Sequence, residues 1–154
     1  MLLRAASLST RVSVALGFGA WLALGGMPAS SAEAIGEGPL PALGADVKCD
    51  PVPGPGKVLC TVRERAIGGR FSWGDVIVLS APAFAPPLRT RIAAADASRN
   101  DAEGADFALA LAARDDGVGE LRVLARAVVC GAAGCRPVRA EAVAKVVVGA
   151  PGGR

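Results

Sequence analysis

The sequence predicts an all-β domain in which two antiparallel sheets pack face to face. Three observations support this prediction. Apolar residues alternate with other residues at period two over several stretches, short glycine-containing turns separate these stretches, and no stretch has a convincing helical period. Period-two alternation is typical of strands that bury one face and expose the other. We therefore expect six to eight short strands within residues 45–148.

Residues 1–34 have the pattern of a secretory signal peptide. Arg4 and Arg11 precede an uncharged apolar run over residues 12–24, and Ala32-Glu33-Ala34 is a small-x-small cleavage pattern. A transmembrane anchor is the alternative, but the apolar run has 13 residues, whereas a spanning helix needs about 20. We expect cleavage, export to the periplasm or the extracellular space, and no membrane anchor in the mature chain.

The mature chain is nearly balanced in charge. Residues 1–34 hold two of the 17 basic and one of the 14 acidic residues, so 15 basic and 13 acidic residues remain, a net charge of +2. This balance argues against nucleic acid or an anionic membrane as a partner. Glycine and proline over residues 35–44 predict a flexible leader, and residues 149–154 are predicted to be a disordered tail.

The first predicted strands cover residues 57–66, 70–80 and 88–93. The run DVIVL at residues 75–79 is consistent with a central strand, and Phe71 or Trp73 is expected to fill the core. Three prolines keep residues 81–87 out of the interior of any hydrogen-bonded ladder. Residues 93–102 are expected to form a loop.

The clearest alternation lies in residues 106–114, 120–129 and 138–148. Asp115-Asp116-Gly117 suits a three-residue hairpin loop, which would pair Leu111 with Leu121 and Asp106 with Arg126. A one-residue slip would move the large apolar side chains opposite arginines, so burial favours this register.

A second hairpin is predicted around the turn at residues 131–134. Its register sets Cys130 opposite Cys135, Val123 opposite Ala142 and Glu120 opposite Lys145. Both cysteines then lie on the face opposite the apolar one. Together with the upstream strands, these hairpins predict an immunoglobulin-like antiparallel β-sandwich.

Four cysteines lie in the predicted exported part, where disulfides are the default. Three connectivities are possible, and local pairing, Cys49–Cys60 and Cys130–Cys135, is favoured because it sets Val47 opposite Val62. Both pairs are candidate structural disulfides. The Cys130–Cys135 loop is the shorter, so its bridge stabilises the fold less. Cys130 and Cys135 are therefore also the candidate catalytic residues, as a redox pair.

Few other reactive groups are present. The chain has no histidine, which excludes a Ser-His-Asp triad, a Cys-His dyad and a histidine metal site. The C-x10-C and C-x4-C spacings fit a zinc site poorly. The acidic stretch at residues 96–106 lacks the glycine and terminal glutamate of an EF-hand. We expect neither a metal nor a cofactor.

The stretch VLARAVVCGAAGCRPV, residues 123–138, followed by an alternating strand, resembles the end of the N-terminal periplasmic domain of DsbD-type thiol–disulfide interchange proteins. The resemblance implies an immunoglobulin-like sandwich with Cys130 and Cys135 as its redox pair, Pro137 as the proline after the pair, and a thioredoxin-fold partner. Val128 and Val129 stand where the family commonly has an aromatic residue. The Cys49/Cys60 pair is not part of the family's pattern.

Two function classes therefore remain open from the sequence. The first is a non-enzymatic binding or accessory domain with an unidentified protein partner, in which Cys130–Cys135 is a hairpin staple. The second is a thiol–disulfide exchange module, in which Cys130 and Cys135 cycle between disulfide and dithiol. Whether the chain is an enzyme depends on this choice.

Overall fold

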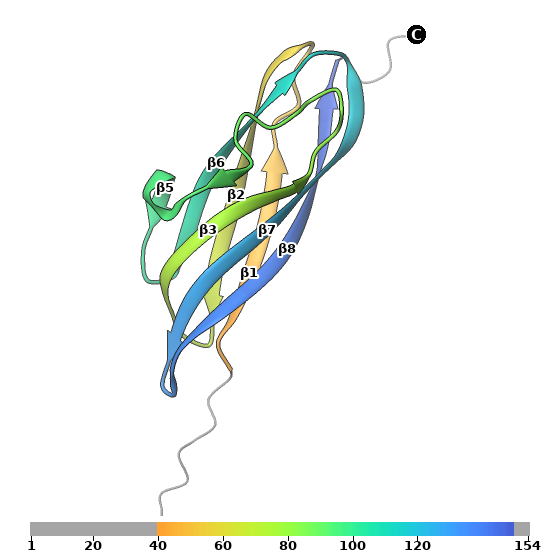
Figure 1. Ribbon diagram of the computed structural model, residues 1–154. Coiled ribbons are helices and arrows are strands. Elements are labelled where there is room, and N and C mark those ends of the chain that lie inside the picture. The colour runs from red at the N-terminus through yellow and green to blue at the C-terminus, as the bar shows by residue number, and fades with distance from the viewer. Residues whose placement is uncertain (1–39, 150–154) are drawn as a thin grey trace, which may run out of the picture. The chain divides into compact units, whose positions relative to one another are not determined.

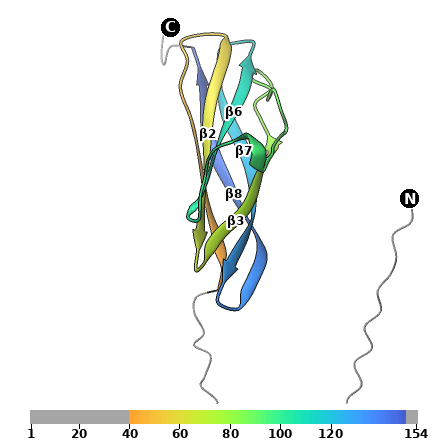
Figure 2. The ribbon, with the colours of Figure 1, turned by 90° about the vertical axis from the view of Figure 1, so that its left-hand side faces the viewer.

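The computed structural model describes residues 40–149, which form two four-stranded antiparallel sheets, shown in Figures 1 and 2 from directions 90° apart. The predicted signal peptide, the first half of the predicted leader (residues 35–39) and residues 150–154 lie outside the described residues. The elements, in chain order, are β1 (Ala42–Cys49), β2 (Gly56–Ile67), β3 (Arg70–Ser80), β4 (Arg91–Ile92), the 3-10 helix η1 (Ala94–Asp96), β5 (Ala97–Asn100), β6 (Gly104–Ala113), β7 (Gly117–Gly131) and β8 (Gly134–Val148).

One sheet has the strand order β1-β2-β6-β5, and the other has the order β4-β3-β7-β8. The chain crosses between the sheets after β2, after β4 and after β6. The apolar inner faces of the two sheets pack together, so the β-sandwich prediction is confirmed. β1 begins at Ala42, three residues before the predicted start of the domain.

Two of the predicted segments between residues 88 and 102 differ from the structure. The strand expected at residues 88–93 is reduced to β4, and η1 and β5 occupy most of the loop expected at residues 93–102. No helix within residues 40–149 is long and apolar enough to cross a membrane.

The hairpin of β7 and β8 has the predicted register throughout. Cys130 faces Cys135, Val123 faces Ala142, and Glu120 faces Lys145. The predicted β1–β2 pairing, which sets Val47 opposite Val62 and Cys49 opposite Cys60, is also present. Alternation and turn position were sufficient to fix the β7–β8 register, and the assumed Cys49–Cys60 pairing was sufficient to fix the β1–β2 register.

The predicted hairpin at Asp115-Asp116-Gly117 is wrong. β6 pairs with β2 and β5, whereas β7 pairs with β3 and β8, so this connection passes from one sheet to the other. Alternation specified correctly that Leu111 and Leu121 point into the core, and both are fully buried. It did not specify that they belong to opposite sheets rather than to one ladder.

The core is made by the inward-facing side chains of both sheets. Phe107, Leu109 and Leu111 come from β6, and Leu121 and Val123 come from β7.

Of the two aromatic residues expected in the core, Phe71 is buried and Trp73 is 39% exposed. The register shifts between them, because Phe71 pairs with Val129 and Trp73 with Val128. Ser72 is the extra residue of a β-bulge, which turns Trp73 to the outer face.

Candidate functional site

The Cys130–Cys135 disulfide lies at the tip of the β7–β8 hairpin, at the lower end of the domain in Figure 1. Only two residues, Ala132 and Ala133, separate the strands. Gly134 follows with a φ of 114°, a conformation that favours glycine. The turn therefore sets the two sulfur-bearing residues directly opposite each other.

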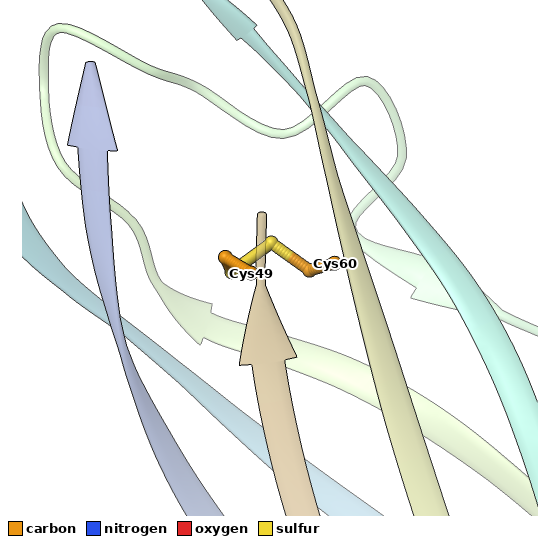
Figure 3. The surroundings of a disulfide bond; sticks show 2 residues. All are labelled: Cys49 and Cys60. Atoms are coloured by element: carbon orange, nitrogen blue, oxygen red, sulfur yellow. A yellow bond between two sulfur atoms is a disulfide. The ribbon is translucent and has the colours of Figure 1, made fainter. Parts of the chain in front are cut away.

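The two disulfides differ in exposure. Cys135 is exposed and Cys130 is half-buried, and both lie on the outer face of the β4-β3-β7-β8 sheet, as predicted. Cys60 is 2% exposed and belongs to the core, where it is joined to Cys49 at the end of β1 (Figure 3). Solvent and partner thiols can therefore reach Cys135 more easily than Cys60.

The structure does not bring the two disulfides together. Pro41, just before β1, would lie 3.1 Å from a methyl group at Gly131, so the start of β1 adjoins the β7–β8 tip. Cys49 is the last residue of the eight-residue β1, about 24 Å further along at the rise of a β-strand. The two cysteine pairs thus lie at opposite ends of β1 and cannot form one four-cysteine centre.

Two arginines are direct neighbours of the cysteines at the tip. Arg136 follows Cys135 in the chain, and Arg70 of β3 is the cross-strand partner of Cys130. The β2–β3 turn packs closely here: Gly68 has a φ of 69°, and a methyl group at Gly69 would lie 2.7 Å from the carbonyl oxygen of Cys130. Sequence reasoning missed Arg70 because its pairing joins residues 60 positions apart.

Next to the disulfide, the outer face carries an apolar row. Trp73, Val128 and Pro137 are cross-strand neighbours on β3, β7 and β8. They stand about 7 Å from the cysteine row, which is the rise of two strand residues. Proline lacks a donor, but β8 is the edge strand of its sheet, a position that tolerates proline.

The following row on this face carries charge. Asp75 is fully buried, and it accepts hydrogen bonds from Arg126 Nε at 2.9 Å, from Arg126 Nη2 at 2.6 Å and from Arg91 Nε at 2.7 Å. Burial alone would raise the pKa of Asp75, but the hydrogen bonds and charges of the two arginines outweigh it and hold the pKa below its ordinary value. Arg126 was predicted to pair with Asp106; that carboxylate pairs with Arg99 instead.

The apolar row and the charged row together line a shallow pocket of about 480 Å³. Its walls include Trp73, Arg126, Val128, Pro137, Val138 and Arg139. Arg126 and Arg139 are direct cross-strand partners. Within residues 40–149, Arg139 makes no ion pair. The pocket therefore combines an aromatic wall with an unneutralised guanidinium group.

Glu64 differs from Asp75 of the outer face, because its carboxyl group lies inside the sandwich. Glu64 of β2 is fully buried, and within the described residues neither of its carboxylate oxygens has a hydrogen-bond partner. Burial, and secondly the negative charge of Asp75, raises the pKa of Glu64 to about 8. Gly74 makes room for it, because a methyl group there would overlap both the Glu64 carboxyl and the Phe71 ring. The sequence analysis did not single out Glu64. The period-two alternation of β2, which places Glu64 inward, is the sequence signal that could have identified it.

Metal ligation has little support in the described part of the chain. Residues 40–149 contain no group of three or more cysteine, aspartate or glutamate side chains placed to hold a metal ion. Two carboxylates of the acidic stretch, Asp101 and Asp106, form ion pairs with Arg99.

No family model and no curated protein matches the chain. Two solved structures show a likeness to it. The VesB protease of Vibrio cholerae has a TM-score of 0.35 and 14% identity over 69% of this chain, which spans 32% of that protein. AggA, the major subunit of aggregative adherence fimbriae type I from Escherichia coli, has a TM-score of 0.35 and 5% identity over 69% of this chain and 95% of its own. Likeness at this level carries no argument about activity or partners.

Proposed function

We propose that the chain is an exported, non-enzymatic binding domain that contacts a partner protein through the outer face of the β4-β3-β7-β8 sheet. The observation that carries this proposal is the set of large apolar side chains exposed on that face, namely Trp73 at 39%, Leu79 at 47%, Val143 at 49% and Val118 at 61%. Exposed apolar patches on folded domains are typical of protein–protein contact.

The opposite face of the sandwich differs in character. The outward residues of β2 include Lys57, Thr61, Arg63 and Arg65, and the large apolar side chains among them are Leu59 and Ile67. Interfaces are enriched in aromatic residues and arginine and depleted in lysine. The composition of the two faces therefore favours the β4-β3-β7-β8 sheet as the binding face.

Export is supported by the cysteines. All four form disulfides, and none is free. Disulfides persist in oxidising compartments and are rare in the cytosol. Together with the signal-peptide pattern of residues 1–34, this favours the periplasm or the extracellular space.

Site-specific photocrosslinking tests the binding face. A photoreactive phenylalanine derivative at position 143 is expected to crosslink a discrete partner in cells that make the protein, whereas the same group at position 61, on the outer face of β2, is not. Both positions are exposed strand residues, so each variant is expected to fold. Crosslinking at position 61 alone, or at neither position, would contradict the proposed face.

A second function has its own observation, the accessibility of Cys135. If the resemblance to DsbD-type proteins holds, a thiolate of a thioredoxin-fold partner attacks the Cys135 sulfur and forms a mixed disulfide, while Cys130 leaves as a thiolate. The partner's second thiol then displaces Cys135. The partner becomes oxidised by two electrons, and this chain becomes the dithiol.

A glutathione redox titration, with thiols mapped by alkylation and mass spectrometry, separates the two functions. A staple stays oxidised at potentials below about −300 mV. An exchange pair opens near −200 mV while the buried Cys49–Cys60 bond stays closed. The exchange function is withdrawn if both disulfides open together or neither opens.

A further inference from the structure

The pocket beside Trp73 has a chemistry more specific than that of the surrounding face. We propose that it binds a carboxylate side chain of the partner, with an apolar side chain of the same segment packed against Trp73, Val128 and Pro137. This inference rests on the proposed binding function and names the chemical class of segment that the face receives. Three observations carry it: the balance of charge, the unused donors and the apolar wall.

The charged row is short of negative charge. Arg91, Arg126 and Arg139 supply three guanidinium groups, and among residues 40–149 Asp75 supplies the one carboxylate that forms an ion pair with any of them. Arg126 and Arg139 are direct cross-strand partners, and like charges in that position repel. An anion between them would relieve this repulsion, so the row is complementary to a negative group.

Donors remain for such an anion. Asp75 occupies Nε and Nη2 of Arg126, which leaves Arg126 Nη1 without a bond to Asp75. Arg139 is exposed and donates no side-chain hydrogen bond within residues 40–149. A planar guanidinium presents paired N–H groups that match the two oxygens of a carboxylate. The fixed Arg126 and the free Arg139 can therefore hold one carboxylate from two sides.

The apolar wall argues for a peptide segment rather than a free inorganic anion. Trp73, Val128 and Pro137 stand in one cross-strand row next to the arginines. The pocket volume of about 480 Å³ is within the usual range of ligand sites. It can accommodate one large apolar side chain beside the carboxylate. A segment in which an acidic residue adjoins an apolar one satisfies both halves of the pocket.

The test uses the exported protein with Trp21→Phe. Trp21 lies in the predicted signal peptide, so Trp73 is the one tryptophan whether or not that peptide has been removed. The probes are two blocked tripeptides, phenylalanine–glutamate–phenylalanine and phenylalanine–glutamine–phenylalanine, followed by the fluorescence of Trp73. The glutamate peptide is expected to saturate the signal with a dissociation constant at least tenfold lower than that of the glutamine peptide. Arg139→Ala is expected to remove this tenfold preference.

Arg122→Ala is the matched control. Arg122 lies on the same outer face but pairs with Glu141 and does not line the pocket. This variant is expected to keep the preference for the glutamate peptide, and both arginines are surface side chains, so their removal leaves the core intact. Equal affinities for the two peptides, or a preference that survives Arg139→Ala, would overturn the inference.

Inorganic phosphate is the third probe. It is expected to compete weakly or not at all, because it cannot use the apolar wall. If phosphate displaces the glutamate peptide at equal concentration, the pocket is a general anion site and the peptide assignment is wrong. If no tripeptide binds while position 143 still crosslinks a partner, the pocket chemistry fails and the proposed binding face stands.

Discussion

Asp75 is a buried acid whose charge is balanced by two arginines that reach it from other strands. Arg126 comes from β7 and Arg91 from β4, so this carboxylate connects three strands of one sheet. A buried charge is stable only when it is paired and hydrogen-bonded. Asp75 therefore stabilises the β4-β3-β7-β8 sheet and also neutralises part of the positive charge beside the pocket.

We expect Asp75→Asn to lower the free energy of unfolding by about 2 kcal/mol, below the 3–5 kcal/mol typical when one partner of a fully buried pair is lost. The effect is smaller because Arg91 and Arg126 are 58% and 40% exposed and can be hydrated after the change. Urea unfolding at pH 7 measures it.

Glu141→Gln is the comparison for that experiment. It removes the exposed Arg122–Glu141 pair, which is expected to contribute less than about 1 kcal/mol. If the two substitutions have equal effects, the ion pairs of Asp75 do not stabilise the sheet in the way described.

At the scale of strands, local patterns predicted the hairpins and failed where the chain changes sheet. The β7–β8 register followed from a turn and two alternating strands that adjoin in sequence. Between β6 and β7 the same reasoning chose a ladder, although the two strands belong to different sheets. Alternation reports which side of a strand is buried, and it says nothing about which sheet buries it.

The positions of Trp73 and Asp75 on β3 could not be predicted for the same physical reason. Cys130 and Cys135 could be paired from sequence because they belong to one hairpin. A β-bulge turns Trp73 outward to the pocket, and period-two alternation does not predict where a bulge occurs. The pairing of Asp75 with Arg126 joins residues 51 positions apart, and only the sheet order brings them together.

The two disulfides give a prediction at the scale of hairpins. We expect Cys49→Ala with Cys60→Ala to destabilise the domain more than Cys130→Ala with Cys135→Ala. The chain-entropy contributions are about 3 and about 2 kcal/mol, because the first bridge closes the longer loop. Cys60 is also buried in the core, so its truncation leaves unfilled space there.

Urea unfolding of the two double variants measures this difference. The β7–β8 variant is expected to keep the wild-type far-ultraviolet circular dichroism, since its disulfide lies outside the core. An equal or reversed order of stabilities would show that the hairpin tip contributes more to the fold than its exposure indicates.

For the whole molecule, one buried carboxyl group is expected to dominate the pH dependence of stability between pH 5 and pH 8. The chain has no histidine, so no histidine titrates between pH 5 and pH 8. Within residues 40–149, Glu64 is the acid whose pKa is raised into that range, to about 8. The pKa of Asp75 is lowered in the folded domain. The stabilisation that the ionised Asp75 contributes is therefore lost in acid, as the pH falls through its folded-state pKa.

The sign of the Glu64 effect follows from proton release on unfolding. In the unfolded chain Glu64 loses its proton near its ordinary pKa of 4.5, whereas in the folded domain it keeps the proton until about pH 8. Between these values the unfolded state binds fewer protons, so a rising pH favours unfolding. The protonated Glu64 therefore contributes its full stability below pH 4.5 and progressively less above it.

We expect the free energy of unfolding to fall by a few kcal/mol between pH 5 and pH 8, at a slope of up to about 1.4 kcal/mol per pH unit for one proton. Glu64→Gln cannot ionise and is expected to remove most of this slope, whatever its effect on absolute stability. Glu120→Gln, at an exposed position, is expected to keep it. Urea unfolding of the three proteins at half-unit pH intervals measures the slopes. A Glu64→Gln variant with the wild-type slope would show that this carboxyl group is hydrated or paired in solution, because an isolated buried acid must couple its proton to the fold.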